Sequence, residues 1–255
     1  MNLQFNPTLA ERYTSASQIA RVLTTDWLAH QMYCPHCGEV TIRHTRPNTS
    51  IVGHVCDNCG SQYELKSRRN ESDRFLSTVA GGAYRTMMDR ITSLDNPSFF
   101  FMHHNGYEVN NLIIVPKCFF TPNVIEKRKA LSVGAQRTGW EGCNILMREI
   151  PATAKIPVIL NGEVLHQKEV ISQYNKVFSL QTSSVESRGW LVDILLLVEK
   201  MEEVFTLNQM YAFCDELKIK YPNNNHIQDK IRQQLQFLRD KGFIEFKGRG
   251  VYRRI

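Results

Sequence analysis

The sequence contains no long hydrophobic run. Its longest stretch of consecutive apolar residues, 194–198, has five members. A helix that crosses a bilayer needs about 20 such residues. No basic segment followed by an apolar stretch occurs near the N-terminus, so we expect no secretory signal peptide. These two absences argue against a membrane or secreted protein, and we expect a cytoplasmic one.

The cysteine count also excludes one class of protein. Seven cysteines are an odd number, and four of them occur as two closely spaced pairs. A secreted scaffold built on disulfides usually has an even number. Cysteines used as metal ligands belong to a reducing compartment. The remaining three, Cys118, Cys143 and Cys214, stand in apolar surroundings and are expected to be core residues.

The composition is that of an ordinary globular protein. Hydrophobic residues make up 42% and charged residues 22% of 255 residues, which is enough for a sizeable core and for two domains. Helix-like and strand-like patterns alternate along the first two thirds of the chain, which favours an α/β or α+β core. Strands are predicted at 98–102, 112–115 and 156–160, the last leading into the hairpin signal Asn161-Gly162.

Two helices are predicted in the same part of the chain. The first occupies much of the first thirty residues, where Ser15 and Gln18 resemble a capping box. Apolar residues at helical spacing predict its buried stripe and a second helix further on. The stripe is Ile19, Leu23 and Trp27, and the second helix is indicated by Val79, Ala83, Met87 and Ile91.

Two CxxC pairs, Cys34 with Cys37 and Cys56 with Cys59, are the strongest local motif. Eighteen residues separate the pairs, which is the spacing of a structural zinc site. Four thiolates complete a tetrahedral shell and leave no open position for chemistry. Four unrelated buried thiols at this spacing would be a coincidence, so we expect a zinc ribbon.

Glu64 and Lys66 follow the last cysteine pair and belong to a predicted strand. Residues two apart on a strand face the same side of it, so these side chains can share one site. Glu64 and the Leu65 carbonyl are candidate Mg²⁺ ligands, and Lys66 is a candidate to orient water or stabilise developing negative charge. Such chemistry needs a second carboxylate, about one strand earlier. The motif is short, and a surface ion pair is the alternative.

The C-terminal part is predicted to be a winged helix-turn-helix. A polar stretch, 181–187, resembles a linker, and helices are predicted at 190–201, 206–220 and 226–241, with Thr206 and Gln209 as a capping box. Strands at 243–246 and 251–254 flank a basic, glycine-containing tip. From residue 224 to the end, eight basic side chains face three acidic ones, a net charge of +5 out of +6 for the chain.

This charge favours a DNA partner over a protein partner. The first turns of a recognition helix meet base edges in the major groove, and basic residues at a wing tip hold phosphates. The base-contact candidates are Asn224, Asn225, His226, Gln228, Arg232 and Gln233, and the phosphate-contact candidates are Lys247 and Arg249. Solvated charges on a protein-binding domain are the alternative.

Trp140 stands between two glycines and shortly after a basic run. A tryptophan in such a loop is most often an anchor packed on the core. With Arg137 and the preceding basic residues 127–129 nearby, a nucleic-acid contact is the second interpretation.

The chain closely resembles the DpnI-like, Dam-replacing family of methyl-directed type II restriction endonucleases. The resemblance extends over nearly the full length. It is carried by NNHIQDKIRQQLQFLRDKGFIEFKGRGVYRR at the C-terminal end and by the cysteine pairs, YELKS, AYRTMMDR, NPSFFFM and GWEGCNI at matching spacing.

The resemblance implies two domains and an activity. It implies a PD-(D/E)xK nuclease domain at 1–182 with a zinc ribbon inserted at about 33–62, and a winged-helix DNA-binding domain at 183–255. Both domains would read double-stranded GATC methylated on adenine, and the nuclease would cut both strands with Mg²⁺ as part of a restriction system. We expect a monomer.

The resemblance also assigns residues. Glu64 and Lys66 match the catalytic acid and lysine, and Trp140 matches the aromatic residue that packs against the adenine methyl groups. Arg188 and Trp190 fall in the segment where the winged helix would meet DNA.

One position departs from the family pattern. The first metal-binding aspartate of the family is expected where this chain has Gly53, which offers no ligand. Asp57 lies within a cysteine pair, and His54 is expected on the opposite strand face and is a poor Mg²⁺ ligand. We favour impaired cleavage over a ligand from elsewhere, such as Glu11 or Asp26. A non-cleaving methyl-DNA-binding protein or transcription regulator is the alternative function.

Overall fold

The structure is a computed structural model that describes residues 1–255 except 46–52, 71–76, 94–95 and 183. Part of the expected zinc ribbon and one residue of the expected linker therefore lie outside the described residues. None of the helices in the described part is long and apolar enough to cross a membrane.

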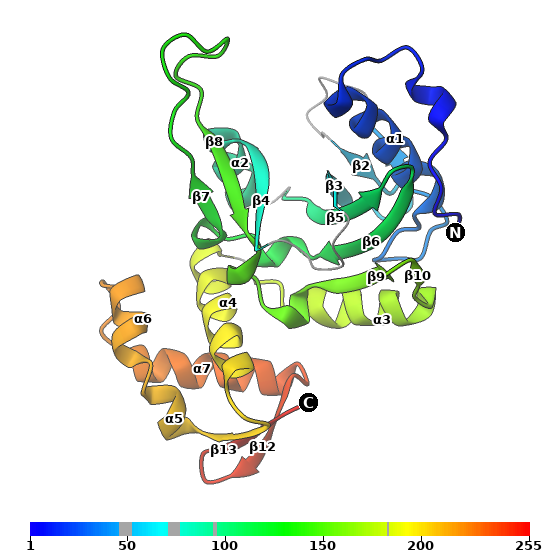
Figure 1. The fold of residues 1–255 in the computed structure, drawn as a ribbon. Coiled ribbons are helices and arrows are strands. Elements are labelled where there is room, and N and C mark those ends of the chain that lie inside the picture. Colours follow the sequence, from blue (N-terminus) through cyan, green and yellow to red (C-terminus); the bar gives the residue numbers. More distant parts are fainter. Residues whose placement is uncertain (46–52, 71–76, 94–95, 183) are drawn as a thin grey trace.

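A seven-stranded sheet forms the centre of the N-terminal part (Figure 1). Its strand order is β1-β2-β3-β5-β6-β9-β10, and β3 with β5 is its parallel pair. β5 is buried along almost its whole length, as expected of a strand covered on both faces. The strands are β1 Arg43–His44, β2 His54–Val55, β3 Gln62–Arg69, β5 Ser98–Asn105, β6 Glu108–Val115, β9 Ile156–Leu160 and β10 Glu163–Val164.

The hairpin between β9 and β10 confirms the Asn161-Gly162 signal. Both residues have positive φ, +50° and +79°, as the two central positions of a type I′ turn require. Leu160 pairs with Glu163 directly across this turn.

Helices cover the two faces of the sheet. Figure 1 shows α1 (Ala16–Gln31) on one side and α3 (Gln167–Phe178) on the other. Leu23 and Trp27 of α1 are buried as predicted, and Ile19 is half-buried. The predicted capping box is wrong, because the Ser15 hydroxyl contacts Ser17 Oγ at 3.0 Å instead of a backbone N–H of the first turn.

A smaller sheet, β4-β8-β7, lies beside the first, and it corrects one helix prediction. Val79 and Ala83 belong to β4 (Thr78–Ala83), and only the second half of the predicted helix forms, as α2 (Tyr84–Thr92). Gly81 explains this, because a Cβ there would lie 2.4 Å from Cys143 Sγ, so glycine allows β8 to approach. The other strands are β7 Ile125–Lys127 and β8 Gly142–Leu146.

The C-terminal part consists of helices and a three-stranded sheet of order β11-β13-β12. The capping box of Thr206 and Gln209 is confirmed, but the helix that it begins is interrupted near Ala212. The first helix of this part begins earlier than predicted and takes up the last three residues, 185–187, of the expected linker. The elements are α4 Val185–Lys200, β11 Val204–Thr206, α5 Leu207–Tyr211, α6 Cys214–Lys220, α7 Ile227–Asp240, β12 Ile244–Gly248 and β13 Val251–Arg254.

Short 3-10 helices connect several of these elements. They are η1 Pro7–Ala10, η2 Lys117–Phe119, η3 Pro122–Val124, η4 Met147–Glu149 and η5 Ala152–Ala154.

Helix α4 joins the two parts. The Glu199 carboxylate accepts hydrogen bonds from the backbone N–H groups of Ala152 and Thr153, both at 2.8 Å. At the other end of α4, Arg188 Nη2 donates to the Ile91 carbonyl at 3.1 Å. Since a hydrogen bond to a charged group is stronger than a neutral one, these contacts fix the position of α4 on the N-terminal part.

Candidate functional site

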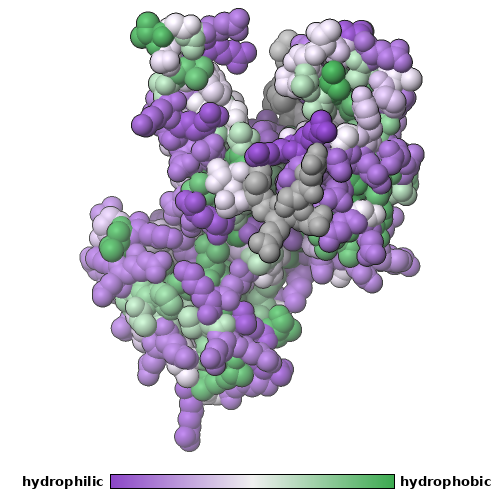
Figure 2. Space-filling model, viewed as in Figure 1, coloured by the Kyte–Doolittle hydropathy of each residue, from purple (hydrophilic) through white to green (hydrophobic). Residues whose placement is uncertain are grey.

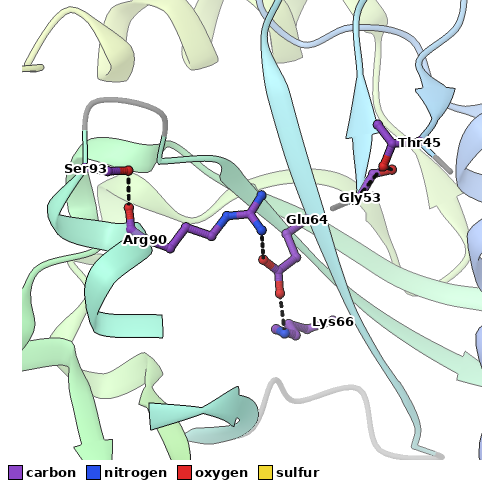
Figure 3. Close-up of polar contacts among 6 residues, drawn as sticks. All are labelled: Thr45, Gly53, Glu64, Lys66, Arg90 and Ser93. Carbon is purple, nitrogen blue, oxygen red and sulfur yellow. Dashed lines mark hydrogen bonds and ion pairs between the residues drawn. The ribbon is translucent and has the colours of Figure 1, made fainter. Parts of the chain in front are cut away.

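Glu64 and Lys66 lie on the same face of β3, as predicted. Lys66 Nζ is 2.5 Å from Glu64 Oε1, and the two side chains are only 18% and 17% exposed. A third charged group joins them from α2, where Arg90 Nη1 lies 3.8 Å from Glu64 Oε2 (Figure 3). Both carboxylate oxygens therefore face a cation, and the cluster of Glu64, Lys66 and Arg90 carries a net charge of +1.

Sequence reasoning missed Arg90. It lies in the AYRTMMDR segment, which contributed to the family resemblance, but its distance from Glu64 along the chain gives no local signal. The end of α2 holds it in place, because Ser93 donates to the Arg90 carbonyl through its N–H at 3.2 Å and its hydroxyl at 2.8 Å. The helix thus ends directly beside the acid on β3.

Gly53 lies next to Glu64 and directly precedes the neighbouring strand, β2. In the antiparallel register His54 pairs with Tyr63 and Val55 with Gln62. One step back along β2 and one step forward along β3, residue 53 therefore lies beside Glu64. A Cβ at Gly53 would be 3.4 Å from Glu64 Cα. The location is therefore the one at which the resemblance expects a metal-binding aspartate.

The backbone at Gly53 suits glycine alone. Its φ is +128°, and a Cβ would lie 2.3 Å from the Tyr63 carbonyl oxygen. Thr45 keeps the backbone there, because its N–H and hydroxyl reach the Gly53 carbonyl at 2.8 and 3.1 Å. An aspartate at this position would need a shift of the local backbone before its carboxylate could reach a metal.

Two acids near Gly53 or named as alternatives, Asp57 and Asp26, are paired with other side chains. Asp57 pairs with Arg43 at 2.9 Å on the exposed surface, and Asp26 pairs with His30 at 3.2 Å. The cysteine cluster is the one group of three or more potential ligands within mutual reach among the described residues. Glu64 and the Leu65 carbonyl offer two oxygen ligands, fewer than the six positions of an Mg²⁺ shell, and both Glu64 oxygens face cations.

His54 has a structural role. It is 1% exposed, and Nε2 lies 3.2 Å from the Thr25 carbonyl oxygen in α1. Burial lowers the pKa of His54 to about 4, so the ring is neutral at pH 7, and it can donate to Thr25 through Nε2. This orientation agrees with the expected position away from the Glu64 face.

The four cysteines form a compact cluster. Their sulfur atoms lie within 4.8 Å of one another, and Cys34–Cys59 and Cys37–Cys56 are both 3.6 Å apart. A tetrahedral shell with zinc–sulfur bonds of about 2.3 Å has sulfur–sulfur edges of roughly 3.8 Å. The cluster therefore fits Zn²⁺.

The cysteine cluster is attached to α3 on the main sheet. His36 Nδ1 lies 2.8 Å from Asn175 Oδ1, and Asn175 Nδ2 donates to the His36 carbonyl at 2.9 Å. A metal held by the cysteines would thus stabilise the packing of the sheet edge as well as the loop.

Most of the predicted DNA-contact residues are exposed. They lie just before α7, in its first turns, and at the turn between β12 and β13. Asn224 is half-buried, and its Oδ1 accepts a hydrogen bond from the His226 N–H at 2.7 Å. Arg232 pairs with Asp229 on the same helix. The exposed candidates are Asn225, His226, Gln228, Arg232, Gln233, Lys247 and Arg249.

The structure gives Arg188 and Trp190 a packing role instead of a DNA contact. They are 7% and 0% exposed. Trp190 stacks on Tyr221 with ring centroids 3.9 Å apart, and Arg188 bonds to the Ile91 carbonyl. Because neither side chain offers a surface to a duplex, we do not retain them as DNA-contact candidates.

Trp140 lies in the long hairpin between β7 and β8, which projects from the molecule (Figure 1). It is half-buried, and its ring covers Gly142, where a Cβ would come within 2.7 Å of the indole. Arg137 is exposed on the same hairpin. Figure 2 shows hydrophilic residues along this projection and hydrophobic residues at its end, where Val133 is 94% exposed.

Comparison with known families agrees with this arrangement. Residues 1–183 match the DpnI model, described as the Dam-replacing family. Residues 186–254 match the DpnI C-terminal model, described as the Dam-replacing HTH domain. Together the two matches span nearly the whole chain.

Removal of the metal is expected to unfold the cysteine-containing region. Structural zinc contributes an apparent folding free energy of roughly 10–16 kcal/mol in small zinc domains. Purified protein should contain one zinc per chain by elemental analysis, and a strong chelator should lower its melting temperature. Cys37→Ser should lose the zinc, whereas Cys214→Ser, at a half-buried position in α6, should keep it. A metal-free protein of unchanged stability would contradict the zinc site.

Replacement of Gly53 by alanine is expected to destabilise the fold. The strained φ and the close Tyr63 carbonyl together should cost about 1–3 kcal/mol of unfolding free energy. The control is Gly106→Ala, also at positive φ (+56°) but in open space. Urea denaturation should show a larger loss for Gly53→Ala than for the control. Equal losses would show that the Tyr63 contact relaxes at no cost.

Proposed function

Since the chain belongs to the DpnI-type Dam-replacing family of restriction endonucleases, we propose that it recognises double-stranded GATC methylated on adenine and that its Mg²⁺-dependent cleavage is impaired. In this proposal residues 1–182 form a PD-(D/E)xK nuclease domain and residues 183–255 a winged-helix DNA-binding domain. The observation that carries it is the Glu64–Lys66 pair on β3 with Gly53 beside it.

The C-terminal part supports recognition of DNA. Gln228, Arg232 and Gln233 project from the first turns of α7 into solvent, where a recognition helix meets base edges. Arginine pairs with guanine, and glutamine with adenine, through two hydrogen bonds. Lys247 and Arg249 at the β12–β13 turn are positioned to hold phosphates and set the register.

Trp140 supports recognition of the methyl group. An adenine methyl group stands in the major groove, and an apolar ring is a suitable partner for it. The hairpin keeps part of the indole exposed while Gly142 supports the rest of the ring from below. Arg137, exposed on the same hairpin, is a candidate phosphate contact beside it.

The surroundings of Glu64 support impaired cleavage. Phosphodiester hydrolysis by a divalent ion needs ligands that hold the ion against both the water and the phosphate. Gly53 supplies none, and Lys66 and Arg90 face the two Glu64 oxygens. Of the family's catalytic set, this chain therefore retains the acid and the lysine without a second acidic ligand from the described residues.

A second candidate is a methyl-DNA-binding protein or transcription regulator that does not cut. The backbone at Gly53 favours it, because φ of +128° and the Tyr63 contact exclude a simple return of the aspartate. In this candidate the same DNA contacts remain, and Glu64 and Lys66 have only structural and electrostatic roles.

The first test compares plasmid DNA with and without adenine methylation. The wild-type chain is expected to bind the methylated plasmid more tightly and to nick it slowly in Mg²⁺. Gly53→Asp should cut the methylated plasmid faster than Gly53→Ala, because both variants strain the backbone but only one adds a ligand. Gel mobility shifts and plasmid cleavage measure the two properties.

Each other outcome of that comparison has a definite meaning. Rapid cutting by the wild type would show that another carboxylate serves and that Gly53 does not impair cleavage. No cutting by Gly53→Asp, together with retained binding, would favour the second candidate. Equal binding to both plasmids would contradict methylation dependence.

Trp140 provides a second prediction. Trp140→Ala should reduce the preference for methylated over unmethylated duplex by about 4-fold per methyl group, since burial of one such group contributes about 0.8 kcal/mol. The control is Tyr107→Ala, an aromatic residue that is 52% exposed in the β5–β6 turn. Fluorescence anisotropy with both duplexes measures the ratio, and an unchanged ratio in Trp140→Ala would contradict the methyl contact.

A further inference from the structure

The cysteine cluster would be negatively charged with a metal bound, because four thiolates outweigh the charge of Zn²⁺. Its four sulfur atoms do not share one environment. Cys37 and Cys59 are exposed, whereas Cys34 and Cys56 are 0% exposed. A buried negative charge needs hydrogen-bond donors in place of water. Donors that contact metal ligands also orient those ligands and strengthen metal binding.

Two side-chain donors belong to the loop that carries the second cysteine pair. Ser61 Oγ lies 3.2 Å from Cys59 Sγ, and Asn58 Nδ2 lies 3.5 Å from Cys37 Sγ. Both sulfur atoms are on the exposed side of the cluster. Water can therefore replace either donor.

A third side-chain donor comes from the main sheet. The hydroxyl oxygen of Tyr63, a residue of β3, lies 3.0 Å from Cys34 Sγ. Both residues are 0% exposed, so water cannot take the place of this hydroxyl. A tyrosine hydroxyl keeps its proton at pH 7, and a metal-bound thiolate has none. In the metal-loaded cluster Tyr63 therefore donates and Cys34 accepts.

Tyr63 also contacts the surroundings of Glu64. Successive side chains of a strand point to opposite faces, so Tyr63 faces the cysteine cluster and Glu64 faces away from it. The backbone of Tyr63 pairs with His54 on β2 and with Ser98 on β5. Its carbonyl oxygen is the atom that leaves no room for a side chain at Gly53. A bond that fixes the Tyr63 hydroxyl thus acts directly on the strand that carries Glu64.

We propose that Tyr63 is a positioning residue of the zinc site, whose hydroxyl donates to the Cys34 thiolate and thereby connects the bound metal to β3. The hydroxyl strengthens zinc binding, because it supplies a hydrogen bond to a sulfur atom that solvent does not reach. In return, bound zinc holds the first residues of β3 in place beside Gly53.

The first test measures zinc affinity in the full-length chain by competition with a chelator of known affinity. Tyr63→Phe removes the hydroxyl and keeps the ring that packs on Phe100, 5.4 Å away between centroids. Zinc affinity should fall about 10-fold or more, because loss of a partner of a metal ligand typically costs 10–100-fold. The control is Tyr174→Phe, at another buried tyrosine, whose hydroxyl bonds to Ser98 at 2.8 Å. It should keep the wild-type zinc affinity.

The second test replaces zinc by Co²⁺ and records the thiolate-to-metal charge-transfer absorption. A hydrogen bond lowers the energy of the sulfur lone pairs, so its loss reduces the energy needed for charge transfer. The band should therefore move to longer wavelength in Tyr63→Phe and stay in place in Tyr174→Phe. A tyrosine that only fills the core would not move it.

The third test measures the link to β3 by hydrogen exchange with mass spectrometry in saturating zinc. The backbone amides of the segment 62–65 should exchange faster in Tyr63→Phe than in the wild type. Tyr174→Phe should leave exchange in this segment at the wild-type rate. Unchanged exchange in Tyr63→Phe would overturn the connection between the metal and β3.

Four other results would overturn the role of Tyr63. A wild-type zinc affinity in folded Tyr63→Phe is one, and an unchanged cobalt spectrum is another. Equal losses of affinity in Tyr63→Phe and Tyr174→Phe would show a general effect of core packing. A Tyr63→Phe chain that stays unfolded in saturating zinc would also contradict the proposal, because excess metal restores a weakened site by mass action.

Discussion

The parallel pairing of β3 with β5 is the constraint on which the rest of the structure depends. It runs from Tyr63 opposite Ser98 to Arg69 opposite His104. Parallel neighbours need a long crossover, and here that crossover contains β4 and α2. The crossover therefore returns to the sheet with Arg90 beside Glu64. The acid, the lysine and the arginine meet because of this connection.

The site that results is governed by charge and by one glycine. Gly53 lies beside Glu64 in a conformation that excludes a side chain, so the strand next to the acid contributes backbone alone. Without a second carboxylate from the described residues, Lys66 and Arg90 outnumber Glu64. The scaffold that positions Glu64 and Lys66 thus has the electrostatics of a surface that attracts polyanions. Family membership and local charge point to DNA from independent directions.

Sequence patterns predicted the features whose cause is local. The cysteine spacing, the alternation at Glu64 and Lys66, the Asn161-Gly162 turn and the Thr206 cap each depend on a few neighbouring residues, and the structure contains each one. Features that depend on tertiary contacts were missed or misassigned. Arg90 reaches Glu64 through the crossover, and Arg188 and Trp190 are buried by partners far along the chain. Apolar spacing predicts a helix at Val79, where the structure has a strand, because this spacing carries no information about the close approach of β8 to Gly81.

The hydrogen bond from Arg188 to the Ile91 carbonyl has a mechanical consequence. It connects the first turns of α4 to the residue that follows Arg90, and Glu199 secures the opposite end of the same helix. Any tilt of the C-terminal helices would have to break hydrogen bonds to charged groups, of which the Arg188 bond is buried, and such bonds are worth about 1.5–3 kcal/mol each. A force on α7 is therefore transmitted through α4 to the end of α2. Because the two parts of the chain are held at a fixed angle, a straight duplex bound by the C-terminal part can cross the N-terminal part only along one line.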